Sequence, residues 1–169
     1  MPMPTATHAE RTFHTSIDIP EKRRSALIDL LNARLADSTD LKTQTKHAHW
    51  NVKGPQFFQL HELFDSIAPH FDTYSDLIAE RAVQLGGTAN GTLRQAAENS
   101  DIPEFDLSAT TGTEHVKALV KNISKFGKAV REAIDQAEEL EDKDTADIFT
   151  EISRQVDKDL WFLEAHVQA

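Results

Sequence analysis

The sequence contains no cysteine. This excludes disulfide bonds and thiolate metal ligands, and it removes redox-active thiols from any oxidising site. A metal site in this chain would therefore have to use histidine, aspartate and glutamate side chains. The absence of cysteine does not by itself indicate a cellular compartment.

Long hydrophobic runs are also missing. The chain has 169 residues, 39% of them hydrophobic, and no run approaches the ~20 apolar residues of a membrane-spanning helix. The first residues lack the apolar core of a secretory signal. We therefore expect a flexible N-terminal tail (residues 1–17), one globular domain (residues 18–169), a cytoplasmic location and no membrane partner.

Basic residues are scarce relative to acidic ones. Lysine and arginine number 18 against 28 aspartates and glutamates, which gives a formal net charge of −10. This balance argues against a chain built chiefly to coat nucleic acid and suits one that attracts cations.

Glycine and proline are few, and they fall where helical periodicity stops. Apolar residues recur at a spacing of three to four, which predicts four long helices separated by Gly54-Pro55, by Gly86-Gly87 with a polar stretch to about residue 110, and by an acidic turn. The polar stretch is predicted to hold one short helix. The fold class is therefore all-α, a four-helix bundle whose long middle connection lets the second and third helices run parallel. The expected helices are 20–52, 55–86, 93–98, 116–134 and 149–163.

The second long helix carries a stripe of metal-binding side chains. At about 100° per residue, the stripe spans roughly 100° of the helix, beside the apolar face. Its members are His61, Asp65, Asp72, Asp76 and Glu80. Such a stripe suits a hard or borderline cation such as iron, whereas acids alone would more often form a solvated face.

The spacing of this stripe indicates a site shared between two chains. His61 and Asp65 are i, i+4 neighbours, as are Asp76 and Glu80. Fifteen residues separate His61 from Asp76, which corresponds to roughly 20 Å along a helix. His49, at the end of the preceding helix, should come alongside His61. A two-fold related partner could then bring its acid pair to this group, giving two identical sites per dimer.

The usual iron site inside a single helical bundle needs two Glu-x-x-His pairs. None of the eight histidines follows a glutamate by three residues. The intrachain di-iron arrangement is therefore not expected.

Three segments together resemble the Dps proteins, the miniferritins named as DNA-binding proteins from starved cells. They read HAHWNVKGPQFFQLHELFD, DLIAERAVQLGG and DKDTADIFTEISRQVDKDLWFLEAH. The resemblance implies a ferritin-like bundle and a ferroxidase centre at a dimer interface. Its ligands would be His49, His61, Asp65, Asp76 and Glu80. It further implies twelve subunits, oxidation of Fe(II) by hydrogen peroxide in preference to dioxygen, and storage of ferric mineral in a hollow shell.

Further residues have a structural and a functional interpretation. Trp50 and Trp161 are either packing residues or, by resemblance, electron donors close to the centre. Four acids flank the turn between the third and fourth long helices. They either cap helices or, by resemblance, line a three-fold pore for iron entry, although Lys143 stands where some relatives carry an acid. These acids are Glu138, Asp142, Asp144 and Asp147.

Two other functions compete with ferroxidation. A nucleoid-compacting DNA-binding protein with a secondary metal site would need a basic arm, but the first twenty residues hold no lysine and one arginine, Arg11. The basic cluster 22–24 is expected on a helix. We therefore expect weak or absent DNA binding at neutral pH, strengthened in mild acid by His8 and His14. A helical interaction bundle without metal is the third interpretation.

Overall fold

The computed structural model describes residues 11–168, and within that range every element is helical. The helices are α1 (Glu21–Asn51), α2 (Phe57–Gln84), α3 (Leu93–Asn99), α4 (Gly112–Glu139) and α5 (Lys143–Glu164). The four long helices and the short crossover helix agree with the sequence prediction, with ends shifted by a few residues.

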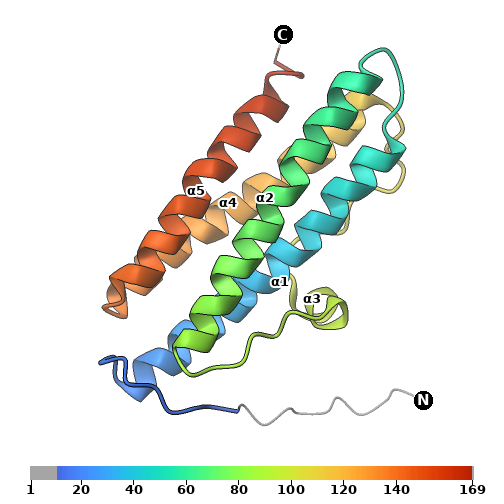
Figure 1. Ribbon diagram of the computed structural model, residues 1–169. Coiled ribbons are helices and arrows are strands. Elements are labelled where there is room, and N and C mark those ends of the chain that lie inside the picture. Colours follow the sequence, from blue (N-terminus) through green and yellow to red (C-terminus); the bar gives the residue numbers. More distant parts are fainter. Residues whose placement is uncertain (1–10, 169) are drawn as a thin grey trace, which may run out of the picture.

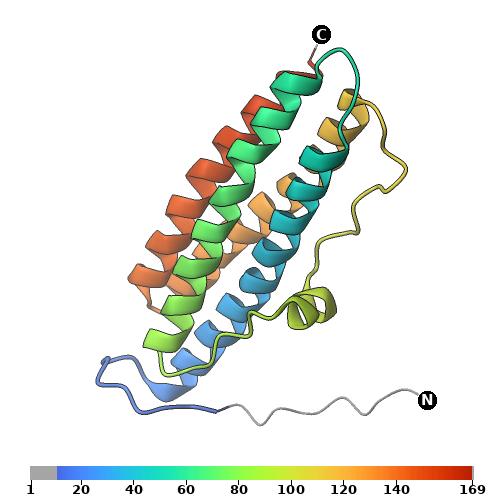
Figure 2. The same cartoon turned by 45° about the vertical axis from the view of Figure 1, so that its right-hand side comes forward.

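The long helices pair as two antiparallel hairpins. α1 turns back into α2, α4 turns back into α5, and the crossover with α3 carries the chain from one end of the bundle to the other (Figure 1). The view from a second side shows the crossover passing along the outside of α1 (Figure 2). α2 and α4 therefore run parallel, which is the up-down-down-up order of a ferritin-like bundle.

Each long helix buries an apolar stripe in one shared core. The largest fully buried side chains include Leu31, Phe64, Phe71, Phe126 and Phe149. Burying each such side chain stabilises the fold by about 1.5–3 kcal/mol relative to leaving it exposed. Within residues 11–168, no helix is long and apolar enough to cross a membrane.

The chain before α1 lies against the end of α2. The backbone N–H of Phe13 donates to the carbonyl of Gly86 at 2.7 Å. Gly86 has a φ of 89°, and a Cβ at this position would collide with the carbonyl oxygen of Phe13. Glycine is therefore required here for two reasons, the left-handed backbone and the close approach of residue 13.

Buried polar side chains hold the crossover against the bundle. Asp37 accepts a hydrogen bond from the backbone N–H of Asp101 at 2.8 Å. Gln44 and Asn122 both donate to the carbonyl of Pro103. Because these groups are buried and paired, the crossover has a fixed path between α1 and α4.

Candidate metal centre

Two histidines face each other across the turn between α1 and α2. His49 Nδ1 lies 2.8 Å from the carbonyl oxygen of His61, and His61 Nδ1 lies 2.9 Å from the carbonyl oxygen of His49. The rings are stacked, with centroids 3.8 Å apart. A carbonyl only accepts, so both Nδ1 atoms carry a proton, and in the neutral rings both Nε2 atoms keep a lone pair for a metal ion.

Asp65 brings a carboxylate to the same place. Its Oδ1 lies 3.8 Å from Nε2 of His49 and 2.6 Å from Nζ of Lys46. The hydrogen bond from Lys46 holds the pKa of Asp65 below its usual range. The structure thus places three of the five predicted ligands near the α1–α2 turn, but not close enough to one another to hold an ion. A cation arriving at Asp65 would compete with the Lys46 ammonium.

The other two predicted ligands stand apart from this group. Asp76 and Glu80 are exposed on α2 and make no side-chain hydrogen bond or ion pair with the described residues. Asp72, between the two pairs, is bonded to Lys42 at 2.5 Å. Across residues 11–168, no three histidine, aspartate or glutamate side chains converge closely enough to hold a metal ion. One chain therefore supplies only part of a site.

Large aromatic side chains are exposed around the histidine pair. Trp50 is 67% exposed, Phe58 is 67% exposed and Phe57 is 44% exposed. Phe57 also lies against His61, with ring centroids 5.1 Å apart, and Lys46 Nζ lies 5.8 Å from the centre of the Trp50 ring. In a single chain Trp50 is therefore not a core residue. Trp161, at 61% exposure, is not one either.

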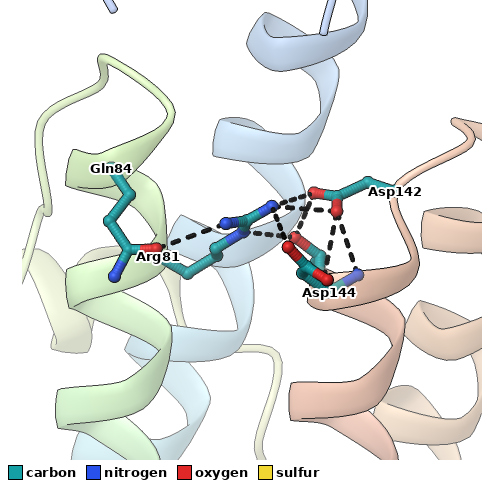
Figure 3. Close-up of polar contacts among 5 residues, drawn as sticks. Arg81, Gln84, Asp142 and Asp144 are labelled. Atoms are coloured by element: carbon teal, nitrogen blue, oxygen red, sulfur yellow. Dashed lines mark hydrogen bonds and ion pairs between the residues drawn. The ribbon is translucent and has the colours of Figure 1, made fainter. Parts of the chain in front are cut away.

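The turn between α4 and α5 holds a buried ion pair (Figure 3). Arg81 reaches across from α2, and its NH2 lies 2.9 and 3.0 Å from the two oxygens of Asp142. The Asp142 side chain in turn accepts hydrogen bonds from the backbone N–H groups of Asp144 and Thr145 at the start of α5. Burial alone would raise the pKa of Asp142, but hydrogen bonds from Thr145 and Arg81 hold it below its usual range.

Asp142 is thus a buried helix cap. Its geometry fits this role better than it fits a residue that lines a pore. Asp144 is 84% exposed, with one oxygen 3.9 Å from Arg81. Glu138 and Asp147 are also exposed near this turn. Of the four predicted pore acids, these three are exposed and so could face a passage for cations.

The sequence patterns missed two residues that shape these sites. Lys46 is separated from Asp65 by nineteen positions, and Arg81 from Asp142 by sixty-one. The available signal for Lys46 is the antiparallel pairing of α1 with α2. If residue 49 faces residue 61, then residue 46 falls opposite residues 64 and 65. Arg81 has no comparable local signal.

Comparison with known proteins places the chain in a family. A family model described as a ferritin-like domain matches residues 28–169. The chain is 44% identical over 158 residues to a DNA protection during starvation protein of Agrobacterium fabrum, covering 94% of this chain and 98% of the relative.

Solved structures give the same result. DpsA14 from Streptomyces coelicolor superposes with a TM-score of 0.90 at 28% identity, covering 96% of each chain. The tetragonal form of Dps from Mycobacterium smegmatis superposes with a TM-score of 0.89 at 29% identity, covering 93% of this chain and 96% of that one. The chain belongs to the Dps family of ferritin-like proteins.

Proposed function

We propose that this protein is a ferroxidase that oxidises Fe(II) with hydrogen peroxide and stores the ferric product as mineral in a hollow homo-oligomeric shell. The observation that carries the proposal is the reciprocal hydrogen bonding of His49 and His61. It fixes both rings in the tautomer that binds metal through Nε2. With the Asp65 carboxylate beside them, the donor set fits a borderline cation such as Fe(II).

The site is completed by Asp76 and Glu80 of a two-fold related partner. Two observations support this arrangement. Both acids are exposed and unpaired among the described residues, and apolar side chains surround the histidines without being covered. Exposed aromatic residues around a polar centre are typical of a protein interface. A closed two-fold dimer would contain two such sites.

Iron is the substrate, and the protein's part is to bind and orient it. Two ferrous ions each give one electron to hydrogen peroxide, whose O–O bond breaks. Hydrolysis of the ferric ions then releases protons and yields oxyhydroxide, which nucleates on carboxylates. Removing iron and peroxide together prevents them from forming damaging radicals. When only one ferrous ion is bound, Trp50, whose ring lies 5.8 Å from Lys46 Nζ, would supply the second electron that peroxide takes.

Iron reaches the interior through the α4–α5 turns of neighbouring subunits. Asp147, Asp144 and Glu138 supply the negative charge, while Asp142 is held by Arg81. A dodecamer of chains with a formal charge of −10 would carry about −120, which concentrates ferrous ions near the shell. We place this chemistry in the cytoplasm.

DNA compaction is the weaker candidate. Lys22, Arg23 and Arg24 lie in the first turn of α1, and Arg23 is bonded to Glu141 at 2.5 Å. His8 lies outside the described residues. DNA affinity depends on lysine and arginine that are free to neutralise phosphates. Protection of DNA would then follow from iron chemistry and need no direct contact.

Anaerobic mixing of ferrous iron with the assembled protein, followed by addition of peroxide, tests the proposed function. Fast oxidation, with ferric iron co-eluting with the protein, is expected. The double change His49→Ala and His61→Ala should abolish the fast phase, whereas His47→Ala should retain it, because His47 packs against Phe105. Equal rates in both variants would refute the site.

A further inference from the structure

A cavity of about 350 Å³ lies between α2 and α5, away from the histidine pair at the α1–α2 turn. Both helices contribute polar side chains to its wall. The lining residues are His70, Thr73, Tyr74, Leu77, Glu151, Arg154 and Gln155. None of these residues belongs to the stripe that the sequence predicted as iron ligands.

His70 is held in the cavity wall by a buried carboxylate. Its Nδ1 lies 2.9 Å from Oδ2 of Asp159, which is 4% exposed, and Gln155 donates to the other oxygen at 3.0 Å. Because the carboxylate accepts the Nδ1 proton, the lone pair of the neutral ring is on Nε2. A carboxylate behind a histidine is the usual support of a metal-binding imidazole.

Tyr74 supplies a second observation. Its side chain is buried, at 4% exposure, and its hydroxyl lies near the Asp159 carboxylate without a hydrogen bond of good geometry among the described residues. Burial raises the pKa of Tyr74, and the nearby Asp159 and Glu151 carboxylates raise it further, so the hydroxyl stays protonated. The hydroxyl oxygen is therefore available to accept a hydrogen bond from a molecule in the cavity.

We propose that this cavity is a second cation site, in which His70 Nε2 and the Glu151 carboxylate bind a divalent transition-metal ion. A water molecule of that ion would donate a hydrogen bond to the Tyr74 hydroxyl oxygen. Two protein ligands and water make a labile site, from which an ion can leave as readily as it enters. The site is separate from the proposed ferroxidase centre and does not depend on it.

Two features of the cavity bear on this assignment. The His70–Asp159 pair alone could serve to tie α2 to α5, but a tie does not explain why His70 and the Glu151 carboxylate line the same cavity. Arg154 also lines the cavity and repels a cation. Its charge distinguishes the proposed cation from an anion such as phosphate, because the two ligands would respond in opposite directions to loss of the guanidinium.

Cobalt(II) binding tests the proposal in the assembled protein carrying His49→Ala and His61→Ala, so that the proposed ferroxidase site does not contribute. Equilibrium dialysis counts the bound ions, and visible absorption reports their ligands. Adding His70→Ala should remove one Co(II) per chain, whereas His166→Ala, outside the cavity, should remove none. Asp159→Asn should weaken binding about 10–100-fold, as loss of a supporting carboxylate does in other metal sites.

Two surface changes keep the test valid if His70→Ala impairs folding. Glu151→Gln should weaken Co(II) binding and Arg154→Gln should strengthen it, while the helical content stays unchanged. Co(II) stoichiometry and affinity that are the same with and without Glu151→Gln would overturn the proposal. Binding of inorganic phosphate that is lost in Arg154→Gln, without any Co(II) binding, would overturn it in favour of an anion site.

Discussion

His49 and His61 bond to each other's backbone across the α1–α2 turn, each placing its Nδ1 within 2.9 Å of the other's carbonyl oxygen. These two hydrogen bonds require residue 49 to lie opposite residue 61, so they fix the register between the two helices. It also sets the tautomer of both rings before any metal arrives. The imidazole half of the proposed centre is therefore preorganised within one chain.

Lys46 should act as a competitor for metal at Asp65. Replacing it in Lys46→Gln removes the ammonium at 2.6 Å and lets the pKa of Asp65 rise toward its ordinary value. We expect binding of Co(II), used as a redox-inert substitute for Fe(II), to strengthen several-fold at neutral pH. Lys42→Gln, which frees Asp72 instead, is the matched control. An affinity for Co(II) that is unchanged or lower in Lys46→Gln would contradict this role.

The buried pair of Arg81 and Asp142 should stabilise the fold. Arg81→Met leaves the Asp142 carboxylate buried without its partner, and we expect the free energy of unfolding to fall by about 3–5 kcal/mol. Denaturant unfolding followed by circular dichroism measures this change. Arg131→Met breaks an exposed pair with Asp157 and should cost less than about 1 kcal/mol. Equal losses of unfolding free energy in Arg81→Met and Arg131→Met would show that the buried ion pair stabilises the fold no more than the exposed one.

The pair of Arg81 and Asp142 also makes the stability of the fold depend on pH, in a direction that follows from the pKa of Asp142. The pKa of Asp142 is lower in the folded state than its ordinary value of about 3.9. Its contribution to stability is therefore present above pH ~4 and is lost as the pH falls through the lowered pKa. The difference in unfolding free energy between wild type and Asp142→Asn should be largest at neutral pH and should shrink in acid. A difference in unfolding free energy that grows in acid would show that the pKa of Asp142 is raised, not lowered, in the folded state.

Iron entry should depend on the acids at the α4–α5 turn. Asp147→Asn removes an exposed charge there, so ferrous uptake should slow at low ionic strength and recover toward wild type as salt screens the field. Stopped-flow absorbance of mineral formation gives the rate. Glu98→Gln removes the same charge from exposed α3 and should have little effect. Unchanged uptake in Asp147→Asn would leave this residue as an ordinary exposed acid of α5.

DNA binding should be weak or absent at about pH 8 in moderate salt, because the chain before α1 offers few phosphate contacts. A gel-shift series with plasmid DNA should show no complex at pH 8 and binding only in mild acid, where histidine side chains in general gain charge. Adding lysines in Thr12→Lys plus Ser16→Lys should create binding at neutral pH. Tight complexes of the unmodified protein at pH 8 would favour the nucleoid-protein alternative.

The helices and the histidine group could be predicted because their signals are local. Residues such as Leu27, Leu31 and Leu35 recur at helical spacing, and Gly54 and Gly86 mark the turns. The i, i+4 spacing of His61 and Asp65 places both on one face whatever lies around them. The structure agrees with the helix predictions because helix geometry determines them, whereas the approach of His49 to His61 also depends on the turn between α1 and α2.

The rest depends on tertiary packing, which spacing does not encode. Asp142 carries a charge, and its sequence neighbours suggest an exposed acid, yet Arg81 from another hairpin buries it. The Tyr74 hydroxyl and the His70–Asp159 pair likewise depend on how α2 meets α5. No local pattern reveals which of several polar residues will be enclosed when two helices pack.

Mixing two inactive variants tests the shared ferroxidase site most directly. One variant carries His49→Ala and His61→Ala, and the other carries Asp76→Ala and Glu80→Ala. Equal amounts are dissociated, reassembled together and measured for peroxide-dependent Fe(II) oxidation, and native mass spectrometry verifies that mixed shells form. Random pairing would restore about one quarter of wild-type activity, because half of the dimers are mixed and each has one intact site. Mixed shells with no more activity than either variant alone would contradict a site built from two chains.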